Sequence, residues 1–423
     1  MKKLILATAC AMVAGTSFAD FSTEQRIGLL EAELQRLKQE VAAQKNANIE
    51  LVQQQNKLTT EVKSVAEKSV KSWTDNVDVY GILRMDGAVD FKDTSVARGR
   101  TFNQINKVPF DASQGNRSDF TVAASRIGFD IKNLAGREEV KAKLEADFWV
   151  DNGKGDGKLR IRHAYVSFDD WLFGQTWSLM SNMETMTESI DYTQFLGVST
   201  TRLPQVRHDF NFNPQHKLQL ALEYESDRTS ELPALTAKYL YKNQAITLMG
   251  QGFINEKRAE VDGQDIDKVS WGVGLGARYK FTLKHSVQAN YYHVKGDQRF
   301  VAYTHQGSSS DGAAMGGDYS VDLNNNSLVM NEFNSLTVGY SQKFNDQWRG
   351  NIATSWIQFA DDNAYARANI NNNKQLSDHA INLIYTPRPY LDLGVEYHLG
   401  ERESFAGETA DISRVNLSAQ YKF

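Results

Sequence analysis

Two different periods of apolar residues divide the chain. Between Ile27 and Ser72, apolar residues recur every third and fourth position, which is the heptad pattern of a coiled coil. After Trp73 the period becomes two, because apolar and polar residues alternate as they do in a β-strand with one apolar face. The change of period predicts a coiled coil over residues 20–73 and a β domain over residues 74–423.

The heptads follow one register from Ile27 onward. Their core positions include Ile27, Leu30, Leu34, Leu37, Val41, Asn48, Leu51, Leu58, Val62 and Val65. At the flanking positions Glu33 and Lys38 have opposite charges, as do Glu40 and Lys45, and this favours parallel association of identical chains. The mixture of Ile, Leu and Val leaves dimer and trimer both open. A solvated amphipathic helix that pairs with nothing is the alternative.

The alternating segments after Trp73 are long. In the first, Val79, Leu83 and Met85 share one face while Arg84 and Asp86 share the other. Such segments occur near residues 77, 121, 139, 158, 171, 205, 216, 233, 244, 267, 285, 333, 347, 378, 389 and 412. Many run for ten residues or more, as a tilted membrane strand requires, whereas strands of soluble domains average five or six. We therefore predict an all-β fold, a 16-stranded antiparallel transmembrane β-barrel preceded by an α-helical coiled coil.

The connections between these segments alternate in length. Short turns are expected near 135–136, 169–170, 213–214, 243, 282–283, 345–346 and 387–388. Long links are expected near 92–118, 152–157, 178–204, 227–232, 256–266, 300–331, 361–377 and 401–411. Outer-membrane barrels have short periplasmic turns and long external loops, so the pattern predicts that both ends of the barrel, and the coiled coil, lie on the periplasmic side.

The N-terminal residues predict export. Lys2 and Lys3 precede an apolar run that ends at Val13, and the small residues Ser17 and Ala19 follow, which is typical of a signal peptide over residues 1–19. The only cysteine lies within this segment, so no disulfide is expected. A formal net charge of -5 argues against nucleic acid as a partner.

The sequence offers no motif for an enzyme, a cofactor or a metal. The glycine-rich stretch 272–277 matches a dinucleotide fingerprint on paper, but that motif needs a helix N-terminus, and here it lies in the middle of a predicted strand. A nucleophile elbow of a lipase or an esterase is absent as well. We expect no catalysis, no cofactor and no metal.

The C-terminal strand ends with alternating apolar residues, of which Tyr421 and Phe423 are the last. This ending resembles the signal that the barrel assembly machinery reads in bacterial outer-membrane proteins. We therefore expect that machinery as a partner, with insertion among outer-membrane lipid and lipopolysaccharide.

Several short motifs, taken in order, carry a family resemblance. They are Asp78-Val-Tyr-Gly81, Ser125-Arg-Ile-Gly128, Arg162-His-Ala-Tyr165, Phe173-Gly-Gln-Thr-Trp177 and Pro204-Gln-Val-Arg207. Together with the heptads they make the chain similar to the trimeric porins of the dicarboxylic-acid porin (DcaP-like) family. The resemblance implies a sixteen-stranded barrel, a homotrimer in the outer membrane of a Gram-negative bacterium, and uptake of small, often anionic solutes.

A barrel of this size leaves a water-filled lumen, so the polar face of the strands sets its selectivity. We expect the third loop to fold inward with Glu184, Glu188 and Asp191, and with Arg202 at its exit. The basic residues expected on the channel wall are Arg84, Arg126, Lys143, Arg160, Arg162, Arg207, Arg278 and Arg414. A basic wall opposite an acidic loop produces a transverse field, and the basic wall favours anions. The alternative is a structural anchor whose coiled coil tethers the barrel to the cell wall or to a periplasmic partner.

Overall fold

The computed structural model describes residues 23–74, 76–91, 106, 108, 110, 117–134, 139–150, 157–192, 194–224, 230–261, 263–301 and 317–423. The expected signal peptide, residues 1–19, lies outside these described residues, as do the side chains of Arg26 and of residues 65–74. The chain divides into two compact units, Met1–Asp75 and Asn76–Phe423. Each unit is described by itself.

The first unit contains one long helix, α2 (Thr23–Thr74, 52 residues). The eight apolar heptad residues from Ile27 to Val62 are 50–70% exposed along it, and Val65 lies among the side chains that are not described. No helix in the described part of the chain combines the length and apolarity needed to cross a membrane. The heptad side chains therefore form an apolar stripe that the rest of the chain leaves uncovered among the described residues.

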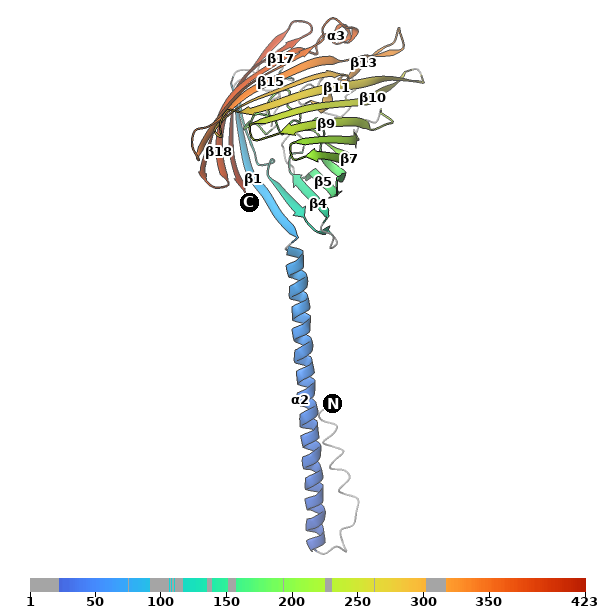
Figure 1. Cartoon of the computed structure of the whole chain (residues 1–423), viewed down its shortest axis with the longest axis vertical. Helices are drawn as coiled ribbons and strands as arrows, with labels where there is room; N and C mark the ends of the chain where they lie inside the picture. The colour runs from blue at the N-terminus through green and yellow to red at the C-terminus, as the bar shows by residue number, and fades with distance from the viewer. Residues whose placement is uncertain are drawn as a thin grey trace. The chain divides into compact units, whose positions relative to one another are not determined.

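The second unit is an antiparallel sheet whose strands follow chain order (Figure 1). Its strands are β1 (Val77–Asp90), β2 (Arg117–Thr121), β3 (Arg126–Ile131), β4 (Val140–Asp147), β5 (Arg160–Phe168), β6 (Trp171–Trp177), β7 (Arg202–Asn213), β8 (His216–Glu223), β9 (Ala234–Lys242), β10 (Ile246–Val261), β11 (Gln264–Lys280), β12 (His285–Lys295), β15 (Glu332–Lys343), β16 (Trp348–Phe359), β17 (Asn373–Arg388), β18 (Leu391–Ser404) and β19 (Thr409–Lys422).

The sheet closes on itself, because β1 pairs with β19 from Ile82 opposite Lys422 to Asp90 opposite Arg414. Segments β2 and β3 both pair with β1, one after the other, and so form one interrupted strand. Within the described residues the barrel thus has sixteen strands, all antiparallel, which confirms the predicted fold. Closure leaves no open edge on the sheet.

The two rims of the barrel differ. The turn rim carries the short connections, and Lys422 donates its N–H there to the Tyr390 carbonyl between β17 and β18. Since β1 begins and β19 ends at this rim, the chain enters and leaves the barrel on the same side. The other rim, called the loop rim below, carries the longer links.

Three of the expected long links contain regular structure. Strand β10 continues to Val261 and strand β11 begins at Gln264, so the link predicted at 256–266 is nearly all strand. Likewise β18 and β19 leave only a short turn where 401–411 was expected as a loop. The 300–331 link contains the hairpin of β13 (Tyr319–Asp322) and β14 (Ser327–Met330). The strands continue to pair beyond the apolar band of the barrel, where apolar and polar residues no longer alternate and the sequence pattern therefore no longer indicates a strand.

The two faces of the wall differ as alternation predicts. Outward-facing Leu83, Ile161 and Leu275 are each more than half exposed. Inward-facing polar residues such as Asp147, Ser355 and Glu396 are fully buried, because other polar side chains and the 178–201 segment cover them. The apolar face is therefore outside and the polar face lines the interior.

Candidate functional site

Residues 178–201, between β6 and β7, fold onto the inner wall and are called the inner loop. The inner loop starts against Glu223 of β8, whose carboxylate accepts from the Ser178 hydroxyl (2.6 Å) and the Leu179 N–H (2.7 Å). Lys238 of β9 then donates to the Ser181 carbonyl at 2.8 Å. These contacts turn the chain into the barrel at the end of β6.

The inner loop next crosses strands that carry glycine on their inward face. Thr185 donates to Asn290 of β12, and a Cβ at Gly276 of β11 would lie 2.5 Å from the Thr185 hydroxyl. A Cβ at Gly339 of β15 would lie 2.0 Å from the Thr187 hydroxyl. At Gly394 of β18 it would lie 2.6 Å from Ile190. Glycine is therefore needed where the loop approaches the wall closely.

The far end of the inner loop is held by Glu396 of β18. Its carboxylate accepts from the N–H groups of Ile190 (3.0 Å) and Asp191 (2.9 Å) and from the Ser189 hydroxyl (2.9 Å). The fully buried ring of His398 lies between Glu396 (2.8 Å) and Asp378 (2.9 Å), an arrangement that suits a ring with two N–H donors. This cluster anchors the loop to the neighbouring strands β17 and β18.

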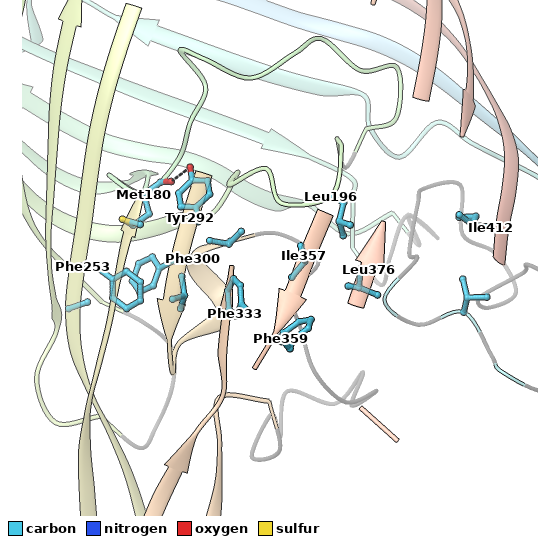
Figure 2. Close-up of a cluster of buried hydrophobic side chains, with 14 residues drawn as sticks. Met180, Leu196, Phe253, Tyr292, Phe300, Phe333, Ile357, Phe359, Leu376 and Ile412 are labelled. Atoms are coloured by element: carbon cyan, nitrogen blue, oxygen red, sulfur yellow. Dashed lines mark hydrogen bonds between the residues drawn. The ribbon is translucent and has the colours of Figure 1, made fainter. Parts of the chain in front are cut away.

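An apolar cluster holds the inner loop on its loop-rim side (Figure 2). Met180 and Leu196 belong to the loop, and Phe300 to the short helix η4 (Gln298–Phe300). They pack with inward side chains of the wall, and the Tyr292 hydroxyl donates to the Met180 carbonyl at 3.1 Å. The wall members include Phe253, Tyr292, Phe333, Ile357, Phe359, Leu376 and Ile412. At this level the inner loop and the wall therefore pack together through apolar side chains.

Arginines from β1, β3, β5 and β7 gather where the inner loop reaches Tyr192. The Tyr192 hydroxyl donates to Asp147 (2.5 Å) and accepts from Arg162 (2.5 Å) and Arg160 (3.3 Å). Arg84 donates to the Ile190 carbonyl at 2.5 Å and lies over the Tyr192 ring. The Tyr192 side chain and the Ile190 carbonyl are thus the groups through which the loop meets these arginines.

This arginine cluster carries an excess of positive charge. Its members are Arg84, Arg126, Arg160, Arg162 and Arg202, and the carboxylates bonded to them are Asp86, Glu145 and Asp147. Arg126 approaches Glu145 only to 3.7 Å. Arg202 lies over the Trp177 ring at 4.0 Å, with no carboxylate partner among the described residues. Five guanidinium groups therefore share three carboxylates.

A β-bulge accounts for two of these inward side chains. The pairing of β4 with β5 shifts between Glu145 and Ala146, so that Arg162 and His163 both point inward. Arg162 donates to Glu145 (2.5 Å) and Asp147 (3.0 Å), while His163 contacts Thr176 (3.0 Å). The phase change in the alternation at His163 is the trace of this bulge in the sequence.

The other basic residues expected on the wall face inward but differ in their partners. Arg414 is 1% exposed and paired with Asp90 (2.5 Å), so it presents no charge to the lumen. Arg207 pairs with Asp209 (2.8 Å), and Lys143 pairs with Asp130 (2.9 Å) and bonds the Tyr80 hydroxyl. Arg278 has no carboxylate partner in the described structure and donates to the Met186 carbonyl (2.6 Å).

Two acidic residues of the inner loop, Glu184 and Glu188, do not face the arginine cluster, contrary to expectation, whereas Asp191 lies close enough to Arg84 to interact with its charge. Glu184 pairs with Lys238 of β9 (2.8 Å), and Glu188 pairs with Arg349 of β16 (2.9 Å). Asp191 is buried beside Asn416. The loop follows the wall from β8 round to β1, so its acids meet the strands they pass rather than those opposite.

Sequence reasoning missed Tyr192, Lys238, Arg349 and His398. In the sequence none of them stands out, since Lys238, Arg349 and His398 are inward polar residues of strands and Tyr192 is an aromatic residue in a loop. Their importance comes from partners in other segments, such as Glu188 for Arg349, 161 residues away, and Asp378 for His398, 20 residues away. Only the glycines at 272, 274 and 276 were visible as a pattern, and the structure assigns them to close packing on the inner wall.

The chain was compared with known proteins. A family model described as DcaP outer membrane protein matches residues 21–423. The crystal structure of the outer membrane channel DcaP of Acinetobacter baumannii is 30% identical, with a TM-score of 0.73, and the match covers 82% of this chain and 97% of that one. Comparison with curated protein sequences gave no match.

More distant structures share the fold. OprB of Pseudomonas putida is 10% identical with a TM-score of 0.53, covering 84% of this chain and 96% of its own. Salmonella typhi OmpF, solved with daunomycin, is 10% identical with a TM-score of 0.52, and the match covers 82% of this chain and 98% of that one. At this identity they support the barrel architecture alone.

Proposed function

The chain belongs to the DcaP outer membrane protein family, and from this premise we propose that it is a porin for small hydrophilic anions, dicarboxylates among them. Its family and fold are those of channels rather than enzymes. The observation that carries the anion preference is the arginine cluster, in which five guanidinium groups share three carboxylates. A wall with an excess of positive charge raises the local concentration of anions.

The inner loop supplies the proposed constriction. It contacts β8, β12, β18 and β1 through Glu223, Asn290, Glu396 and Arg84, so it narrows the lumen along most of its circumference. A narrowed lumen strengthens the effect of wall charges on a passing ion, because less water separates them. We place the arginine cluster in this narrowed region.

The selectivity test is the reversal potential of the purified, full-length protein in a planar bilayer under a potassium chloride gradient. We expect chloride to be preferred over potassium. The double variant R126Q/R202Q removes the two cations with the weakest pairing and should lower this preference roughly fivefold, since a unit charge at 4 Å in water contributes about 1 kcal/mol.

A matched control is K132Q, which removes a cation that already pairs with Asp78 (2.6 Å) near the turn rim. It should leave the reversal potential close to that of the unaltered protein. A cation preference in the unaltered channel contradicts the proposed selectivity. A folded barrel without any open current favours the anchor function.

We also propose that α2 forms a parallel coiled coil with other copies of the chain in the periplasm and that the assembly is a homotrimer. The support is the stripe of heptad side chains, from Ile27 to Val62, which are at least half exposed in a single chain. Burial of such a stripe against identical helices is the usual way to remove it from water. Cleavage of residues 1–19 and recognition of Phe423 by the assembly machinery complete this proposal.

A further inference from the structure

A cavity of about 470 Å³ lies between the inner loop and the inner faces of β11, β12, β15 and β16, next to the turns of the turn rim. Its lining contains five cationic side chains and, among the described residues, one carboxylate, that of Glu188. The cations are Arg278, Lys280, Lys284, Lys343 and Arg349. The arginine cluster contributes none of these residues.

Two of the five cations are already paired. Arg349 binds Glu188 (2.9 Å) and Asp392 (3.1 Å), and Lys343 binds Asp346 (2.8 Å). In the described part of the chain, Arg278, Lys280 and Lys284 have no carboxylate partner. Glu184 and Asp346 lie close enough to interact with the charges of Arg278 and Lys284 without bonding to them, so the cavity keeps an excess of positive charge that is only partly compensated.

Arg278 is the best-positioned of the three. Its Nη2 donates to the Met186 carbonyl at 2.6 Å, which orients the guanidinium group toward the underside of the inner loop. Its Nε is buried and has no hydrogen-bond partner, and the same is true of Oε1 of Gln288, which also lines the cavity. Buried donors and acceptors without partners favour a polar occupant.

We propose that this cavity is a second anion-binding site, specific for small molecules with two or more carboxylates, which Arg278 and Lys280 hold with Lys284 at the entrance. The volume is in the range that small-molecule sites occupy. Two or more carboxylates match several separated cations, whereas chloride engages one at a time. The inference rests on the proposed function and adds a site on the turn-rim side of the inner loop.

The inner loop connects the two sites. Met186 and Glu188 line the cavity, and Tyr192 lies in the arginine cluster a few residues further along. The two groups of cations thus lie against the same stretch of the inner loop. Two sites in series favour release, because each binds less tightly than one combined site.

The experiment measures block of chloride current by succinate in a planar bilayer, with the full-length protein and succinate added to either side. R278Q should raise the half-blocking concentration about tenfold from the side nearer the cavity, since a hydrogen bond to a charged group contributes about 1.5 kcal/mol or more. K280Q/K284Q tests the cavity without removing a contact of the inner loop, and it should raise the half-blocking concentration severalfold. K217Q, which removes an inward lysine of β8 paired with Asp209 (2.7 Å), is the control.

An unchanged half-blocking concentration in K280Q/K284Q overturns the second site, whatever R278Q does, because R278Q also removes the bond to Met186. If that result comes from a channel that prefers chloride, the proposed porin function stands and only the proposed second site is wrong. A cation preference in the unaltered protein, recorded in the same experiment, is the separate failure of the proposed function.

Discussion

Glycine at single inward positions determines how closely the inner loop approaches the wall. Gly276, Gly339 and Gly394 belong to three different strands, and a Cβ on any of them would lie within 2.6 Å of a loop side chain. A barrel wall normally gains from a side chain at such positions. Here the missing side chain provides space for Thr185, Thr187 and Ile190.

Replacing Gly339 with alanine should displace the inner loop. The new Cβ would lie 2.0 Å from the Thr187 hydroxyl and 2.9 Å from its Cβ, so the loop segment must move, at a cost of about 1–3 kcal/mol. We expect a changed single-channel conductance with larger current fluctuations. Gly250→Ala is the control, because nothing lies within 4 Å of its Cβ position. Identical conductance of the two variants would contradict the close packing of the loop.

Helix α2 and the loop-rim hairpin show how elements depend on contacts beyond themselves. The helix exposes its heptad residues, while the hairpin of β13 and β14 packs on the barrel through Ala259 and Ile266. The hairpin is also tied to β10 by Lys257, which is fully buried and binds Asp297 (2.5 Å) and Asp318 (2.9 Å). Both elements need partners that their own sequences do not contain.

The double variant L30N/L37N should weaken self-association of the chain. Both leucines occupy heptad core positions, and each is at least half exposed in the single helix. Loss of two buried leucines per chain costs the oligomer several kcal/mol. I49N is the control, since Ile49 is similarly exposed but lies off the heptad core. The measurement is the temperature at which the detergent-solubilised oligomer dissociates, and equal temperatures for both variants would exclude the coiled coil.

The hairpin should be anchored more firmly at mildly acidic pH. Burial and the nearby Asp297 carboxylate raise the pKa of Asp318 to about 6, above its ordinary value of 3.8. The folded state therefore binds a proton more tightly than the unfolded state, so stability falls as pH rises from about 4 to about 6 and is constant above. Hydrogen exchange of residues 319–330, corrected for intrinsic rates, should show greater protection at pH 5 than at pH 7.5. D318N should remove this difference, and an undiminished difference in D318N would exclude Asp318 as its source.

At the scale of the whole barrel, Phe423 extends the closing seam between β1 and β19 by one residue pair. The N–H of Gly81 donates to the Phe423 carbonyl (2.9 Å), and the Phe423 N–H donates to the Gly81 carbonyl (3.1 Å). The Phe423 ring covers Gly81, where a Cβ would lie 2.4 Å from it. The C-terminal residue thus completes the seam between β19 and β1 at the turn rim.

F423A should reduce the amount of folded barrel in the outer membrane severalfold. The variant loses the ring that covers Gly81 and the terminal aromatic group of the proposed assembly signal. Heat-modifiable mobility in gel electrophoresis of outer-membrane fractions measures the folded barrel. F344A is the control, because Phe344 is as exposed as Phe423 and also packs on a glycine, Gly350. Equal loss in both variants would assign the effect to general packing.

The sequence by itself determined the fold class. Alternation at period two over long segments, an even number of segments and short turns between them lead to a closed sixteen-stranded barrel, because an apolar environment outside and water inside impose that pattern on each strand separately. The heptads likewise define a helix of known register. These properties depend on neighbouring residues only.

Only the tertiary structure decided how the interior is arranged. The inner loop passes along the wall, so Glu188 meets Arg349 and Glu396 binds Ile190, pairs separated by 161 and 206 residues. The arginines were predicted to line the interior, but the sharing of Asp147 by Arg160, Arg162 and Tyr192 depends on a bulge and on the path of the loop. Such contacts depend on strand register and loop path together, and alternation along one strand contains neither.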